Sequence, residues 1–110
     1  MLPPSVDDAL TRYPEALAVL YTSPTYEGLA ANTRAIARAV HAASDHAMVI
    51  VDEAWGGHLR FHPDLPESAM GAGADICVQS THKLAGGLQH AGFFFFAFFA
   101  PNELFDIRVI

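Results

Sequence analysis

The residues best suited to chemistry in this sequence are Asp52 and Lys83, each of which stands after an apolar run. Asp52 follows Met48-Val49-Ile50-Val51, and Lys83 follows Ile76-Cys77-Val78 with a hydroxyl and an imidazole between them. A lysine amine can attack a carbonyl to form an imine, and a carboxylate can hold a proton on a heteroaromatic nitrogen. Pyridoxal 5'-phosphate needs both groups at opposite ends of one flat ring. The pair therefore predicts a site for this coenzyme.

Short motifs surround both residues. Asp52 lies in Val51-Asp52-Glu53-Ala54-Trp55-Gly56-Gly57-His58, and Lys83 ends Ser80-Thr81-His82-Lys83. The other motifs are Ser23-Pro24-Thr25-Tyr26-Glu27-Gly28, Phe61-His62-Pro63 and Gly73-Ala74-Asp75. In these motifs, across residues 5–92, the chain resembles the large domain of the Orn/Lys/Arg decarboxylases. The resemblance implies an aspartate-aminotransferase-like fold and a pyridoxal-phosphate-dependent carboxy-lyase, of which residues 1–110 would be a fragment with a divergent tail at 93–110.

The resemblance also implies roles for the residues around the coenzyme. Lys83 would form the internal aldimine, and Asp52 would pair with the pyridinium nitrogen and keep it protonated. Ser80 and His82 would contact the phosphate or support the lysine.

Four further residues would surround the ring itself by the same resemblance. Ala54 would pack against one ring face, where only a small side chain fits. Trp55 would donate its indole N–H toward the phenolic oxygen, and Ser23 or Thr25 would bond that same oxygen.

Each of these residues also has an ordinary structural alternative. An aspartate at a strand end can cap a turn or a helix, and a lysine is commonly a solvated surface charge. His82 could serve as a loop hydrogen-bonder and Trp55 as core packing. A metal site is a further alternative, because His58 and His62 stand four residues apart, a spacing that suits Zn²⁺ on a helix, with Asp52 and Glu53 nearby. Gly56-Gly57 before the pair and Pro63 after it disfavour such a helix.

Composition limits the class of protein. The chain has 110 residues, enough for one small core, and a net charge of −6, which disfavours nucleic acids and anionic membranes as partners. One cysteine, Cys77, permits no intrachain disulfide and fits a cytoplasmic location. The longest apolar run, Phe93 to Ala100, is far shorter than the roughly 20 residues that span a bilayer.

The apolar periodicity predicts an α/β fold: a three-layer, mostly parallel sheet with flanking helices. The expected elements are helices at 7–12 and 28–43, strands at 16–21, 47–51, 75–80 and 92–99, a long loop at 53–65, and one or two helical turns at 66–70. The strand at 47–51 is apolar throughout, as expected where both sheet faces are covered. Ser23, Asp52 and Ser80 stand at strand ends, so we expect them at one edge, where ligands bind in such sheets.

The function that follows is decarboxylation of ornithine, lysine or arginine. The aspartate and the lysine would equally serve an aminotransferase or a carbon–sulfur lyase of the same fold, and an inactive remnant is the third alternative. The resemblance implies an amino-acid substrate and, in full-length family members, a homo-oligomer with sites at a dimer interface.

Overall fold

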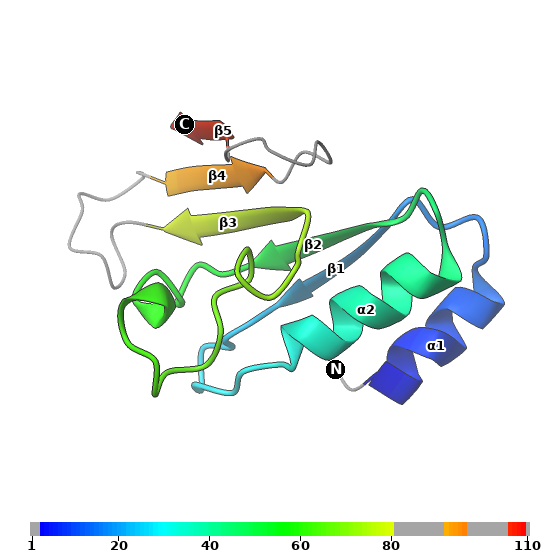
Figure 1. The fold of residues 1–110 in the computed structure, drawn as a ribbon, viewed down its shortest axis with the longest axis horizontal. Helices are drawn as coiled ribbons and strands as arrows, with labels where there is room; N and C mark the ends of the chain where they lie inside the picture. Colours follow the sequence, from blue (N-terminus) through cyan, green and yellow to red (C-terminus); the bar gives the residue numbers. More distant parts are fainter. Residues whose placement is uncertain (1–2, 81–91, 97–105, 110) are drawn as a thin grey trace.

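The computed structural model describes residues 3–80, 92–96 and 106–109, and side-chain surroundings for residues 6–80. The elements run in the order α1 (Pro3–Arg12), β1 (Ala18–Thr22), α2 (Thr33–Ala43), β2 (Met48–Asp52), a 3-10 helix η1 (Leu59–Phe61), β3 (Ile76–Ser80), β4 (Gly92–Phe96) and β5 (Asp106–Val109). Figure 1 shows the strands side by side in sequence order.

The sheet begins as the sequence predicts and then changes direction. β1, β2 and β3 are parallel, with Thr22 opposite Asp52 and Asp52 opposite Val78. β4 covers part of the strand expected at 92–99 but runs antiparallel to β3, and β5 runs antiparallel to β4. The predicted α/β class with parallel strand pairing is confirmed for the first three strands.

Helix α2 is shorter than predicted because a capping residue sets its start. The side chain of Asn32 accepts a hydrogen bond from the backbone N–H of Ala35 at 3.2 Å, which satisfies a donor of the first turn. Gly28 has a positive φ of 91°, outside the helix. The prediction of a helix from Gly28 was therefore wrong by one turn or more, and Leu29, before the start of α2, is 71% exposed.

Other helix and loop boundaries also differ from the predicted ones. The first helix begins at Pro3 instead of residue 7; a proline is well tolerated in a first helical turn because its missing N–H has no helical partner there. Residues 66–68 have no regular structure and residues 69–70 lie in a turn, so the predicted helical turns at 66–70 are not formed. The loop at 53–65 contains η1 but is otherwise irregular, as expected.

The core lies between the two helices and one face of the sheet. Figure 1 shows α1 and α2 side by side on the same side of the strands. Val6 of α1, Ile36 and Val40 of α2, and the alternate strand residues Val49 and Val51 are all fully buried in one cluster. Cys77 of β3 joins that cluster, and burial raises the pKa of its thiol.

The opposite sheet face carries apolar side chains that the described helices leave exposed. Side chains alternate along a strand, so Leu20 and Met48 point away from the core; they are 67% and 41% exposed. The expectation that both faces of this sheet are covered is not met by the helices of the described residues. No described helix is long and apolar enough to cross a bilayer.

Candidate functional site at the carboxyl ends of the parallel strands

Three predicted site residues lie along one edge of the sheet. Asp52 is the last residue of β2, Ser80 is the last residue of β3, and Ser23 directly follows β1. The backbone N–H of Ser23 donates to the carbonyl oxygen of Asp52 at 3.0 Å, so the ends of β1 and β2 are joined. The geometric expectation from the sequence, one shared edge, holds for these three residues.

Asp52 and Ser80 also share a face of the sheet. Val51 and Cys77 point into the core and are fully buried. By alternation, Asp52 and Ser80 therefore point to the face that carries no described helix. Oδ1 of Asp52 accepts a hydrogen bond from the backbone N–H of Ala54 at 3.1 Å. This short turn fixes the carboxylate, which remains half-buried and able to accept a hydrogen bond from a ligand.

The motif after Asp52 forms a compact turn. Ala54 is 8% exposed. Trp55 is half-buried, and its ring meets that of Tyr26 edge to face, with centroids 5.4 Å apart and planes at 78°. The contact joins the turn after β2 to the loop after β1, so Trp55 has a packing role in addition to any role toward a ligand.

Ser23 and Thr25 have partners within their own loop. The hydroxyl oxygen of Ser23 accepts from the N–H of Ala31 at 2.8 Å, and that of Thr25 accepts from the N–H of Leu29 at 3.1 Å. Ser23 is buried, with 6% of its surface exposed. Both hydroxyls thus shape the loop between β1 and α2, and a role toward a ring oxygen stays a prediction.

His82 and Lys83 lie outside the described residues. Their placement relative to Asp52 therefore stays a prediction from the sequence.

Glu53, next to Asp52, is a buried carboxylate whose structural contacts the sequence reasoning did not predict. It is 1% exposed, and its two carboxylate oxygens accept from the backbone N–H of Ala69 and from Nε2 of Gln79, both at 2.8 Å. Burial raises the pKa of this carboxyl, although both hydrogen bonds oppose the shift. A signal was present: the inward alternation of Val49 and Val51 continues to residue 53, so period 2 places this carboxylate in the core.

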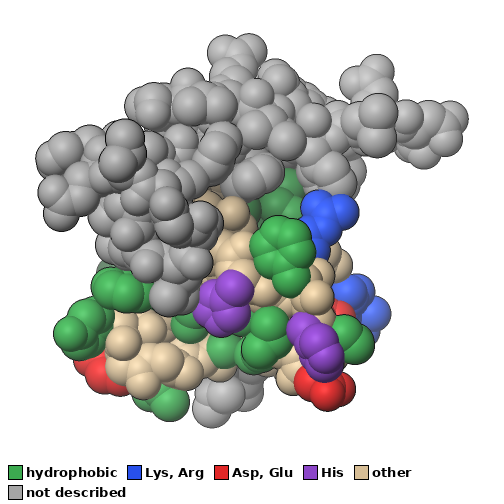
Figure 2. Space-filling view, turned by 90° about the vertical axis from the view of Figure 1, so that its left-hand side faces the viewer, with side chains coloured by type: hydrophobic (Ala, Val, Ile, Leu, Met, Phe, Trp, Pro, Cys, Tyr) green, Lys and Arg blue, Asp and Glu red, His purple; other side chains and the backbone are tan. Residues whose placement is uncertain are grey.

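The view onto this edge of the molecule, Figure 2, shows histidine side chains set among hydrophobic ones. Within residues 3–80, 92–96 and 106–109, no three or more His, Cys, Asp or Glu side chains are grouped so that they could hold a metal ion. His62 instead accepts from the backbone N–H of Asp64 through Nδ1, at 3.1 Å.

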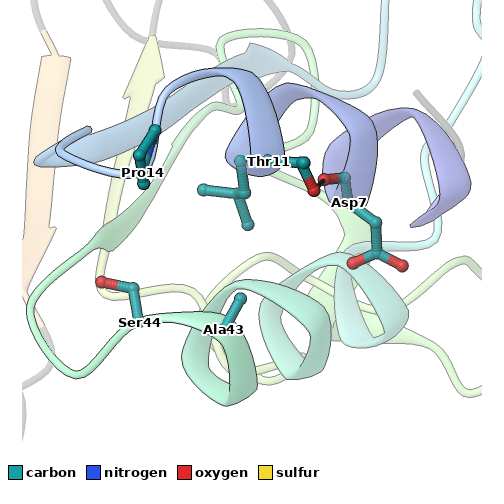
Figure 3. Close-up of a pocket in the computed structure, with 6 residues that line it drawn as sticks. Asp7, Thr11, Pro14, Ala43 and Ser44 are labelled. Atoms are coloured by element: carbon teal, nitrogen blue, oxygen red, sulfur yellow. Dashed lines mark hydrogen bonds between the residues drawn. The ribbon is translucent and has the colours of Figure 1, made fainter.

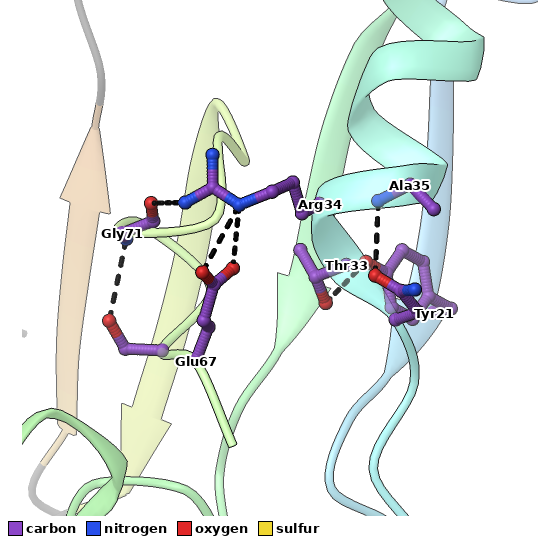
Figure 4. A network of polar contacts seen from close by, with 8 residues as sticks. Tyr21, Thr33, Arg34, Ala35, Glu67 and Gly71 are labelled. Carbon is purple, nitrogen blue, oxygen red and sulfur yellow. Dashed lines mark hydrogen bonds and ion pairs between the residues drawn. The ribbon is translucent and has the colours of Figure 1, made fainter. Parts of the chain in front are cut away.

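A polar network supports the edge from the helix side (Figure 4). Arg34, in the first turn of α2, donates through Nε to both carboxylate oxygens of Glu67 at 3.0 and 3.1 Å, and through Nη2 to the carbonyl of Gly71. The hydroxyl of Tyr21 donates to that of Thr33 at 2.8 Å in a buried contact. These bonds tie α2 to β1 and to the segment that leads into β3.

One hollow lies away from this edge. It has a volume of about 350 Å³ and lies between α1 and the end of α2 (Figure 3). Its lining is Asp7, Leu10, Thr11, Pro14, Ala43 and Ser44. Because Asp7 is its single charged side chain, the hollow offers no matched group of polar residues for a ligand.

Comparison with known proteins identifies the family. The family model described as "Orn/Lys/Arg decarboxylase, major domain" matches residues 2–96. The chain is 49% identical over 87 residues to the arginine decarboxylase of Bacillus subtilis, covering 79% of this chain and 17% of that protein. It is 48% identical to that of Halalkalibacterium halodurans, with the same coverage, and 46% identical to that of Bacillus cereus, covering 79% of this chain and 18% of that protein. The chain thus spans less than a fifth of these relatives, and it belongs to the Orn/Lys/Arg decarboxylase family as part of its major domain.

Proposed function

We propose that this chain is the coenzyme-attachment segment of a pyridoxal-phosphate-dependent decarboxylase that acts on a basic amino acid. Arginine is the favoured substrate among ornithine, lysine and arginine, because the relatives named above are arginine decarboxylases. The observation that carries the proposal is the position of Asp52 and Ser80 on one face, at the carboxyl ends of neighbouring parallel strands.

The described residues fit the coenzyme at its ring-nitrogen end. The carboxylate of Asp52 is held by the N–H of Ala54 and is half-buried, so it can accept a charge-assisted hydrogen bond from the N–H of a protonated ring nitrogen. Ala54, which is 8% exposed, would offer only a small side chain to one face of the ring. When bound, the coenzyme supplies the sink for the electron pair left by departing carbon dioxide.

The residues of this chain would bind the coenzyme and keep its ring nitrogen protonated, and one residue would bond to it covalently. Asp52 keeps the ring nitrogen protonated, which strengthens the electron sink. The hydroxyl of Ser80 and the imidazole of His82 provide donors for a phosphate. Lys83 supplies the amine that attaches the coenzyme; this role rests on the sequence motif alone.

Lys83 is the sole lysine of the chain, which makes a direct test sharp. We expect added pyridoxal phosphate to give a visible imine band, and borohydride to fix the coenzyme on a peptide that contains residue 83. Acetylation of the N-terminal amine excludes the other primary amine. The matched control is Lys83→Arg, which keeps the charge but cannot form the imine.

The proposal fails if the acetylated chain shows no band, or if Lys83→Arg shows an equal one. Release of carbon dioxide from arginine would support a decarboxylase, whereas formation of a keto acid would favour an aminotransferase.

A further inference from the structure

We propose that Glu53 is a positioning residue: its buried carboxylate holds the ends of β2 and β3 together and thereby sets the places of Asp52 and Ser80. The inference rests on the proposed function, because Asp52 and Ser80 matter for the coenzyme only if that function is right. Its test below can be read without any coenzyme.

The hydrogen bonds of Glu53 reach two other segments, β3 and the loop that contains Ala69. Its backbone N–H donates to the carbonyl of Val78 in β3 at 2.8 Å. One carboxylate oxygen accepts from Gln79, the residue before Ser80, and the other accepts from the N–H of Ala69. Glu53 therefore connects the residue after Asp52 with the residue before Ser80, and both with the segment that leads into β3.

The chemistry of the site calls for two acceptors. Two N–H donors bond to one buried side chain, each to a different carboxylate oxygen. A carboxylate satisfies both, whereas an amide has one acceptor and would place its own NH₂ against a donor. Leaving a buried donor without a partner is costly, so the arrangement specifies a carboxylate at this position.

Gly56, in the turn after β2, packs closely against the side chain of Glu53. A methyl group added at Gly56 would overlap Cγ of Glu53 and would lie 2.8 Å from Cδ of Pro24. The N–H of Gly56 donates to the carbonyl of Glu53 at 2.9 Å. The absence of a side chain at 56 thus lets the turn after β2 close on Glu53 and on the segment after Ser23.

The test exchanges the hydrogen-bond acceptor at position 53 and the donor at position 79. Glu53→Gln should break one of the two side-chain bonds. In the double variant Glu53→Gln with Gln79→Glu, the amide at 53 donates to the new carboxylate while its oxygen accepts from Ala69, so the link returns. Gln79→Met, at a half-exposed position, removes one donor and keeps Glu53. Val6→Ala, in the core of α1, is a control that lowers stability away from the edge.

The readout is amide hydrogen exchange of the coenzyme-free chain. The local amides are those of Glu53, bonded to Val78, and of Ala54, bonded to Asp52. The reference amide is Met48, which donates to the carbonyl of Leu17 at the opposite end of β2.

We expect Glu53→Gln and Gln79→Met to speed exchange at 53 and 54 by about tenfold relative to residue 48, the loss of roughly one hydrogen bond. The double variant should restore the wild-type ratio, and Val6→Ala should leave the ratio unchanged. Equal acceleration at all three amides in the Glu53 and Gln79 variants, or a double variant that restores nothing, would overturn the positioning role. A wild-type chain that binds no coenzyme would instead count against the proposed function alone.

Discussion

Oδ2 of Asp75 lies 2.8 Å from Nε2 of His41, and the same oxygen accepts the backbone N–H of Val49 at 2.7 Å. Asp75 directly precedes β3, His41 lies in the last turn of α2, and Val49 belongs to β2. One buried carboxylate therefore joins the helix layer to two strands, at the end of the sheet opposite to the candidate site.

We expect Asp75→Ala to lower the free energy of unfolding by about 2–4 kcal/mol, because it leaves the buried N–H of Val49 without its acceptor. Urea unfolding measures this change. Asp64→Ala, whose side chain is 91% exposed, is the matched control and should change stability by less than about 0.5 kcal/mol. Equal effects of the two substitutions would contradict the assigned role of Asp75.

Gly56→Ala should destabilise the chain by about 1–3 kcal/mol, because the new methyl group overlaps Glu53 and crowds Pro24 in a packed turn. Gly71→Ala is the comparison: its nearest neighbour, 3.0 Å away, is the hydroxyl of Ser68, which can rotate aside. Thermal unfolding of both variants tests the difference. A Gly56→Ala protein as stable as Gly71→Ala would show that the turn after β2 is looser than described.

The pKa of Glu53, raised by burial, predicts the sign of one contribution to the pH dependence of stability. Between its ordinary value of 4.5 and its raised value, the folded chain binds more protons at this site than the unfolded chain does. The contribution of Glu53 to the free energy of unfolding is thus fully present below pH 4.5 and is lost as the pH rises through the folded pKa.

Urea unfolding at several pH values above 4.5 compares the wild type with Glu53→Gln, which does not titrate. The wild type should lose stability more steeply with rising pH than the variant. Parallel curves would mean that this carboxyl titrates alike in the folded and unfolded chains.

Asp52→Asn should weaken the binding of pyridoxal phosphate by about tenfold or more, because a charge-assisted bond to the ring nitrogen becomes a neutral one. The half-buried side chain should tolerate the isosteric change with little loss of stability. Absorbance titration gives the dissociation constant, and Asp64→Asn is the exposed control. An unchanged constant in Asp52→Asn would remove this residue from the coenzyme site.

The sequence alone was sufficient for the parallel part of the fold and for the strand-end positions of Asp52, Ser80 and Ser23. Apolar runs such as Ile50-Val51 are local signals, and a parallel sheet brings the carboxyl ends of its strands together whatever its details. The motifs likewise identified the family, which the comparison with curated relatives confirmed.

Only the tertiary structure decided which carboxylate is structural and where each element ends. The start of α2 depends on a cap by Asn32, and the role of Glu53 depends on donors at Ala69 and Gln79, far along the chain. The antiparallel direction of β4 and the exposure of Leu20 depend on which segments meet. Such contacts join residues distant in sequence, whereas periodicity and spacing report only on near neighbours. The pattern of residues therefore predicted which strand ends lie together, but not the hydrogen bonds that connect them.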